Sequence, residues 1–468
     1  MSKDVAFTSA WELTELIWAK KLSPVEIVNY LLQRIGHLNP KLNAYLTVTE
    51  AEAKPVTKAA EEAVMKGEEL PPLHGIPISI KDLNFTKGIR TTSGSLVYKD
   101  FVPDEDEVAV ERLRRAGAII LGKTNTPEFG QSATTENRLG DHCRNPWNVE
   151  RTTGGSSGGA AAAVAAGLGP LALGSDGGGS IRIPAGFCGV YGLKPTHGRV
   201  PVRPSACMPL FSVNGSITRT VRDAALMLDV MSGYDRGDPA SLREKPTRFL
   251  DAINGGLEGL VVAWSPDLGY AKVEPEVRSV AQSAAYVFQS LGCHVEEATP
   301  ACGEPFSIFS PIALADTYAA HGHLLQKHAE ELMDYIKSTL EFGERVKGYE
   351  YSRALAALAC LRRNMAEFFG RYDLLLTPTN AVPAFPVGQR PREIDGQEVD
   401  RLWGPFPFTT PFNLTGQPAA SVPCGFSSDG LPIGLQIVGR WGDEATVLRA
   451  SAAFERAQPW AHRTPPLS

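Results

Sequence analysis

The first seventy residues carry apolar side chains at the spacing of amphipathic helices. An apolar stripe follows Ser9 and Glu12, which form the pattern of a capping box at a helix start. Residues 23–26 repeat this signal with a proline suited to the first helical turn, and a third amphipathic run covers residues 50–67. Because three helical runs precede any expected strand, we predict that residues 1–70 form a helical arm that packs on the main body.

From residue 71 the pattern changes to short, β-branched apolar runs that alternate with helical ones. The expected strands cover residues 76–80, 118–121, 171–173, 259–263 and 373–378. The expected helices cover residues 105–116, 160–167, 273–291 and most of 316–369. Because strands that alternate with helices favour parallel pairing, the pattern predicts an α/β protein with a mixed, largely parallel sheet.

Composition narrows the kinds of partner that the chain can have. A sequence of 468 residues, 43% hydrophobic and 21% charged, can bury a sizeable core. The net charge of −6 disfavours nucleic acid or an anionic membrane as a partner. No apolar run reaches about 18 residues, and the start lacks the pattern of a secretory leader. We therefore expect a soluble, cytoplasmic protein without a membrane partner.

The seven cysteines are scattered and include no CxxC pair. This spacing is typical neither of a disulfide framework nor of a zinc ribbon. We expect free thiols that are mostly buried.

The stretch from Thr153 to Pro184 is rich in glycine and serine and contains two clusters, residues 154–159 and 176–180. Glycines let backbone N–H groups approach a ligand closely, which suits an anion cradle or a nucleophile beside an oxyanion hole. A flexible linker is disfavoured, because the helix-forming run Ala160–Ala166 separates the clusters. The phosphate-loop alternative lacks its Gly-Lys-Ser/Thr ending.

Lys81, at the end of an expected buried strand, is the candidate base. Burial disfavours the ammonium form and lowers the pKa of a lysine, so that the amine can accept a proton. Ser156 and Ser180 are then candidates for a relay hydroxyl and a nucleophile, because serine needs an adjacent base. The alternative is that Lys81 forms a salt bridge, for example with Asp82.

Histidine chemistry has weaker support in this sequence. None of the nine histidines lies in a strand–turn context as clear as that of Lys81, which disfavours a Ser-His-Asp arrangement. His321, His323 and His328 resemble a metal-binding tract but lack carboxylates at suitable spacing. We expect neither a metal nor another cofactor.

Six motifs occur in the order known from one enzyme family. They are HGIPISIKD (74–82), GKTNTPEFG (122–130), RNPWN (144–148), GGSSGGAAAAVAAG (154–167), GSDGGGSIRIPAGFCGVYGLKPTHGRV (174–200) and GSITRTVRD (215–223). The chain closely resembles the amidase signature family, and the resemblance extends over about residues 8–460. It implies a single large domain, 1–468, whose central twisted sheet is flanked by helices on both faces. In this division the arm covers 1–70, the signature core covers 71–230, and residues 231–468 complete the sheet and the substrate pocket.

The resemblance implies a Ser-cisSer-Lys triad. Ser180 would be the nucleophile that forms an acyl-enzyme, Ser156 the bridging serine after a cis peptide bond, and Lys81 the base. The implied oxyanion donors are the backbone N–H groups of Gly177, Gly178, Gly179 and Ser180. Three neighbours would hold the loop: Ser157, Asp176 and Arg182. Arg182 could instead be a plain surface charge.

The resemblance also implies hydrolysis of an amide C–N bond. We predict an amidase for a small aliphatic or aryl carboxamide, a small-molecule substrate, and leave a homodimer open. Two functions of relatives remain alternatives: the glutamine-hydrolysing subunit of a tRNA-dependent amidotransferase, and a carboxybiuret- or allophanate-type hydrolase. Ile183 and the lack of an acidic residue over 403–413 are unlike the amidotransferase subunits. Aromatic and apolar residues that would form the pocket are Phe129, Ile183, Trp403, Phe406 and Phe408, although the aromatic ones could equally belong to the core.

Overall fold

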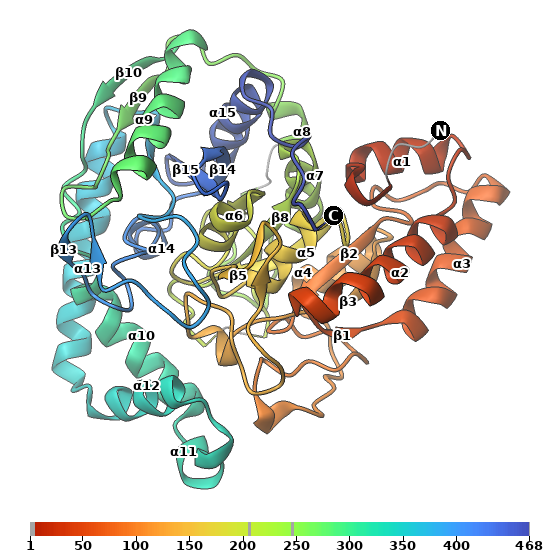
Figure 1. Ribbon diagram of the computed structural model, residues 1–468, viewed down its shortest axis with the longest axis horizontal. Coiled ribbons are helices and arrows are strands. Elements are labelled where there is room, and N and C mark those ends of the chain that lie inside the picture. Colours follow the sequence, from red (N-terminus) through yellow and green to blue (C-terminus); the bar gives the residue numbers. More distant parts are fainter. Residues whose placement is uncertain (1–4, 205–206, 245–247, 468) are drawn as a thin grey trace.

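One large sheet runs through the molecule. The computed structural model describes residues 5–204, 207–244 and 248–467, and within them eleven strands pair in the order β1-β3-β2-β6-β8-β7-β14-β15-β11-β9-β10 (Figure 1). Their bounds are β1 Tyr45–Val48, β2 Pro77–Lys81, β3 Ile119–Thr124, β6 Leu171–Asp176, β7 Tyr191–Lys194, β8 Val213–Thr218, β9 Val261–Trp264, β10 His294–Glu297, β11 Leu374–Pro378, β14 Ala419–Phe426 and β15 Pro432–Gly439. Two short hairpins lie outside this sheet: β4 Arg144–Asn145 with β5 Asn148–Thr152, and β12 Glu393–Ile394 with β13 Gln397–Glu398.

The predicted α/β class with a mixed sheet is confirmed. Pairing is parallel among β3, β2 and β6 and again among β11, β9 and β10. Between these two groups, from β6 through β8, β7, β14 and β15 to β11, neighbouring strands are antiparallel. The parallel groups are the part that the alternation of strands and helices predicted.

Helices surround this sheet. Their bounds are α1 Ala10–Trp18, α2 Pro24–Leu42, α3 Glu50–Lys66, α4 Val108–Arg115, α5 Gly158–Ala165, α6 Arg182–Cys188, α7 Val221–Met231, α8 Phe249–Ala252, α9 Pro275–Ser290, α10 Phe306–His321, α11 Leu324–Lys327, α12 Asp334–Arg345, α13 Gly348–Phe369, α14 Thr410–Leu414 and α15 Glu444–Ala457. A side chain at Gly434 of β15 would meet α6, whereas one at Gly439 would meet Val447 of α15. Positions 434 and 439 are five residues apart, and side chains an odd number of residues apart in a strand point to opposite faces. Helices α6 and α15 therefore cover opposite faces of the sheet.

The N-terminal section begins as predicted and then departs from the prediction. The capping boxes at Ser9 and Ser23 are both present. However, strand β1 lies between α2 and α3 and pairs antiparallel with β3, so the expectation that no strand precedes residue 71 is wrong. Asn43 ends α2 in the left-handed conformation, and the four residues of β1 become a strand by pairing with a partner far along the chain. Local periodicity contains no signal for such a partner.

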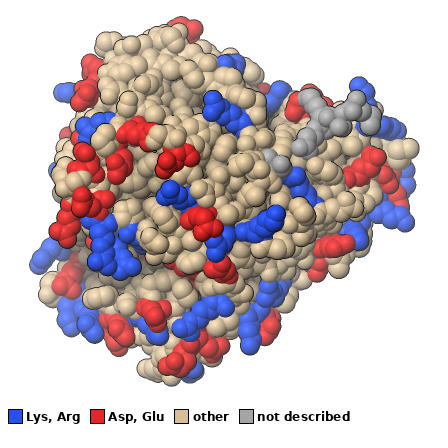
Figure 2. All heavy atoms as spheres, viewed as in Figure 1, with Lys and Arg blue, Asp and Glu red and all other residues tan. Residues whose placement is uncertain are grey.

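The expected state of the cysteines is confirmed among the described residues. All seven are free, and four of them are buried: Cys143, Cys188, Cys293 and Cys302. Within the same residues no helix is long and apolar enough to cross a membrane. On the face seen in Figure 2, acidic and basic side chains are interspersed, and no extended area carries one sign of charge.

Candidate active site

The residues singled out in the sequence converge on one edge of the sheet. Lys81 ends β2, and β6, its parallel neighbour, ends at Asp176. Because parallel neighbours end at the same edge, the loops that follow both strands meet there. Ser156 and Ser180 line one cavity of about 1480 Å³, and the loop glycines Gly177 and Gly178 also line it.

Lys81 lies directly behind Ser156. Its Nζ donates to Ser156 Oγ at 2.7 Å and to Ser175 Oγ at 3.0 Å. The side chain is fully buried, and this burial lowers the pKa of Lys81 to about 7, although Asp176 opposes the shift. The salt-bridge alternative with Asp82 is wrong, because the Asp82 carboxylate accepts the backbone N–H and the hydroxyl of Thr92 instead.

Ser156 follows a cis peptide bond, as the resemblance implied. A Cβ on Gly155 would lie 2.8 Å from backbone atoms of Thr134, so only glycine fits beside the loop of residues 131–136. Ser157 joins the two glycine-serine clusters: its N–H donates to the Ser180 carbonyl at 3.0 Å and its hydroxyl to the Ser175 carbonyl at 3.1 Å. Both neighbours of Ser156 therefore fix its position: Gly155 packs against the loop of residues 131–136, and Ser157 bonds to residues 175 and 180.

Asp176 and Arg182 form the framework of the Ser180 loop. The Asp176 carboxylate accepts the N–H groups of Gly179, at 2.7 Å, and Ile181, at 3.1 Å. Arg182 donates to both Asp176 oxygens, at 2.9 and 3.0 Å. Both side chains are fully buried, so the alternative that Arg182 is a surface charge is wrong. A bidentate pair of this kind fixes the two ends of the loop relative to each other.

Residues far along the chain complete this framework. The Arg182 guanidinium also donates to Asn413 Oδ1 at 2.6 Å and to Gln436 Oε1 at 2.8 Å. Burial by itself would raise the pKa of Asp176, but the charge of Arg182 and its hydrogen bonds hold it well below the usual range. Asp176 therefore remains an anion inside the protein.

The backbone N–H groups beside Ser180 differ in their availability. Within the described residues, the N–H groups of Gly177, Gly178 and Ser180 have no acceptor. The Gly179 N–H already donates to Asp176. Of the four predicted oxyanion donors, Gly179 must therefore be corrected to a residue that shapes the loop, because one N–H cannot serve both acceptors well.

A matched pair of alanine variants tests the role of Gly179. Gly179 has a φ of +135°, and a Cβ there would overlap Thr409 Oγ1, whereas the nearest atom to a Cβ on Gly178 is 3.5 Å away. We expect Gly179→Ala to lower the free energy of unfolding by about 2 kcal/mol or more. Gly178→Ala should change it much less. Urea denaturation of both variants measures the difference, and equal effects would contradict this assignment.

The predicted pocket residues divide into two groups. Phe129, Ile183 and Trp403 line the cavity, and Trp403 stacks on Phe306 with the ring centroids 4.6 Å apart. Phe406 and Phe408 do not: both are fully buried within an aromatic core. Their assignment to the pocket is wrong, because the chain turns inward after Trp403, and the sequence pattern does not distinguish a cavity wall from the core behind it.

Several cavity residues lacked any signal in the sequence. Ser175 is one residue from the predicted Asp176, but strand alternation does not place it beside Lys81, because the register of Ile80 with Leu173 would continue as Lys81 with Gly174. Phe309 of α10 and Arg390 also line the cavity, but both are more than a hundred residues away from Ser180 along the chain. His321 stacks on Phe129 with the centroids 4.2 Å apart. Among the described residues, no group of three histidine, cysteine or acidic side chains is placed to hold a metal ion.

The sequence and the fold are both similar to those of known amidases. The family model described as Amidase matches residues 26–448. The chain is similar to the acylamidase of Rhodococcus erythropolis, with 42% identity over 99% of this chain and 98% of that protein. It is also similar to a glutamyl-tRNA(Gln) amidotransferase subunit of Geobacillus thermodenitrificans, with 38% identity over 97% and 98% of the two chains. Its fold is similar to that of a bacterial aryl acylamidase of the amidase signature family, with a TM-score of 0.93 and 35% identity over 98% of both chains.

Proposed function

The chain belongs to the amidase family and is a hydrolase of carbon–nitrogen amide bonds, and we propose that it cleaves small carboxamides through an acyl-enzyme on Ser180. In this proposal Ser156 is the proton relay and Lys81 is the base. The observation that carries it is the 2.7 Å contact between Lys81 Nζ and Ser156 Oγ, made by a fully buried amine.

The first half-reaction forms the ester. Neutral Lys81 accepts the proton of Ser156, Ser156 accepts the proton of Ser180, and Ser180 Oγ bonds to the substrate carbonyl carbon. The carbonyl oxygen becomes an oxyanion, which the N–H groups of Gly177, Gly178 and Ser180 are available to bind. The relay then returns a proton to the amide nitrogen, the C–N bond breaks, and the amine or ammonia leaves.

The second half-reaction releases the acid. Water gives a proton to the same relay and attacks the ester carbonyl, and the bond between Ser180 Oγ and the acyl carbon breaks. The carboxylate leaves, and Ser180 recovers its proton. No metal or organic cofactor takes part in the proposed steps.

The activity should depend on the protonation of Lys81. Only the neutral amine can accept a proton, and burial lowers the pKa of Lys81 to about 7. We expect kcat/KM to rise with pH, with a midpoint near pH 7, and to level off above it. A pH–rate profile measures this limb. Lys194, a second buried lysine with a pKa lowered to about 7, offers a control. A Lys194→Met variant should keep the midpoint, and a rate independent of pH across this range would contradict the role of Lys81.

The cavity supports substrates with an apolar or aryl group. Trp403, Phe309 and Phe129 supply aromatic walls beside the glycine loop. The names of similar proteins, an acylamidase and an aryl acylamidase, support the same class. We therefore propose aliphatic and aryl carboxamides as substrates.

A panel of aliphatic, aryl and dicarboxylic amides tests this proposal by release of ammonia or amine. Labelling with a fluorophosphonate, followed by peptide mass spectrometry, should identify Ser180 as the modified residue. One observation supports the amidotransferase alternative: the chain is similar to an amidotransferase subunit over almost its whole length. Glutaminase activity without turnover of aryl amides would support that alternative and contradict ours.

A further inference from the structure

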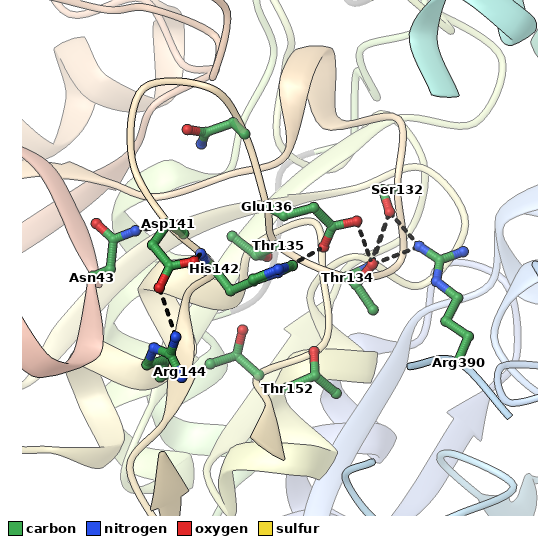
Figure 3. A network of polar contacts seen from close by, with 12 residues as sticks. Asn43, Ser132, Thr134, Thr135, Glu136, Asp141, His142, Arg144, Thr152 and Arg390 are labelled. Carbon is green, nitrogen blue, oxygen red and sulfur yellow. Dashed lines mark hydrogen bonds and ion pairs between the residues drawn. The ribbon is translucent and has the colours of Figure 1, made fainter. Parts of the chain in front are cut away.

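Arg390 places a cation on the wall of the active-site cavity. It follows β11 in a loop that also contributes Phe385 and Gly388 to this wall. Figure 3 shows its guanidinium directed at Ser132 and Thr134. The Arg390 side chain therefore connects the C-terminal part of the chain with the loop of residues 131–136 on the wall of the cavity.

The protein neutralises this cation only indirectly. Arg390 Nη2 donates to the hydroxyl of Ser132 and, at 2.6 Å, to that of Thr134, and within the described residues Arg390 forms no ion pair. The link to a carboxylate passes through Thr134, whose hydroxyl donates to Glu136 Oε1 at 2.9 Å (Figure 3). Burial lowers the pKa of Arg390, while the charge of Glu136 opposes the shift. Arg390 is half-buried, and a guanidinium partly withdrawn from water without an ion pair gains stability from an anionic ligand.

The remaining donors of Arg390 suit a carboxylate. Among the described residues, its Nε and Nη1 have no acceptor. Both forks of a guanidinium include Nη2, which already donates to the two hydroxyls, so the free donors offer a carboxylate single charge-assisted hydrogen bonds from Nη1 or from Nε. The two hydroxyls fix the direction of the guanidinium in advance, which lowers the entropic cost of binding.

The position of Arg390 relates this cation to the reaction. The loop of residues 131–136, to which Arg390 donates, packs through Thr134 against Gly155, the residue before Ser156. Arg390, Ser156 and Ser180 line the same cavity. Trp403 and Phe309 add apolar surface to the wall of this cavity. A ligand that fills this space has an amide at one end, an apolar body and an anionic group at the other end.

We propose that Arg390 recognises a carboxylate on the substrate, so that the preferred substrates are amides with an apolar body and a carboxylate. This inference rests on the proposed amide hydrolysis and specifies its substrate class. Arg390 acts as a specificity-determining residue and takes no part in proton transfer.

Two matched pairs of substrates test the proposal. Acetanilide and para-acetamidobenzoate differ by a carboxylate on the amine side, and butyranilide and succinanilate differ by one on the acyl side. For at least one pair, the unaltered enzyme should prefer the charged substrate. Arg390→Gln should then lower kcat/KM for that substrate by about 10- to 100-fold, mainly through KM, because charge-assisted hydrogen bonds are lost. Its effect on the neutral partner should be small.

Controls separate charge, geometry and folding. Arg390→Lys keeps the charge but cannot donate to the two hydroxyls and to the substrate from separate nitrogens, and it should give an intermediate loss. Arg392 is exposed two residues away, and Arg392→Gln should leave both substrates of each pair unchanged. Equal losses on the charged and neutral substrates, or no loss on either, would overturn the role of Arg390.

A binding measurement separates this proposal from the proposed hydrolysis. In the Ser180→Ala background, calorimetric titration with succinanilate and para-acetamidobenzoate reports affinity without turnover. Affinity for at least one of them that falls about 10-fold or more when Arg390→Gln is added supports the carboxylate site even if no amide is hydrolysed. Affinity for both that is independent of Arg390, with amide hydrolysis intact, contradicts only the carboxylate site.

Discussion

Ser180→Ala is expected to lower kcat for every amide substrate by about 10⁴-fold or more, because it removes the only atom that forms the acyl-enzyme in the proposed mechanism. The alanine variant should fold normally, since Ser180 lies on a loop at the cavity and Asp176 holds that loop through its neighbours Gly179 and Ile181. Steady-state release of ammonia or amine measures the loss. Substrate affinity, measured by calorimetry, should change little.

A second serine of the same cavity provides the control. Ser338 of α12 also lines the cavity, but it lies on a helix away from the glycine loop. Ser338→Ala should keep a rate close to that of the unaltered enzyme. If Ser180→Ala kept most of its activity, the acyl-enzyme on Ser180 would be wrong, and Ser175, which also contacts Lys81, would be the next candidate.

Arg182→Met is expected to lower the free energy of unfolding by about 3–5 kcal/mol, because it leaves the buried carboxylate of Asp176 without its counter-charge. The pKa of Asp176 lies well below the usual range in the folded protein. Its contribution is therefore fully present at neutral pH and is lost only when the pH falls below the ordinary range of aspartic acid. Urea denaturation at neutral pH measures the loss.

Two further variants test whether the loss of stability is specific to the buried pair of Asp176 and Arg182. Lys54 and Glu50 form an exposed pair on α3, and Lys54→Met should change the free energy of unfolding by less than about 1 kcal/mol. The double variant Asp176→Asn with Arg182→Met removes the buried charge and should recover part of the stability. It should not recover activity, because the loop that carries Ser180 loses its framework. A double variant no more stable than Arg182→Met would show that packing, and not the unpaired charge, dominates.

The catalytic candidates were accessible from the sequence because their chemistry is local. Repeated glycines beside serine are entropically costly in ordinary structure, so they indicate a specific role. Lys81 at the end of an apolar strand stands out because burial disfavours its charged form. The structure places Lys81 against Ser156 at the expected edge of the sheet. In contrast, β1 could not be predicted, because its four residues are a strand only through pairing with β3.

The walls of the cavity were predicted less well than its catalytic edge. Trp403 and Phe406 are both aromatic and lie three residues apart, yet Trp403 faces the cavity and Phe406 is core. Aromatic side chains serve both environments, so residue type alone does not decide between them. The residues around Arg390 in the sequence contain no signal for its place at the cavity, because its hydrogen-bond partners Ser132 and Thr134 lie on a loop far away along the chain.

The sequence by itself determined the α/β class, the family resemblance and the residues that can carry the chemistry, because helix periods, capping pairs and glycine-serine clusters act within a few residues of each other. The tertiary structure alone decided what surrounds them. It buried Lys81 and so lowered its pKa, and it paired Arg182 with Asp176, Asn413 and Gln436. It also placed Phe406 and Phe408 in the core and Arg390 at the cavity. Burial and charge pairing depend on the distance between atoms in space, and residues hundreds of positions apart reach that distance only when the sheet is assembled.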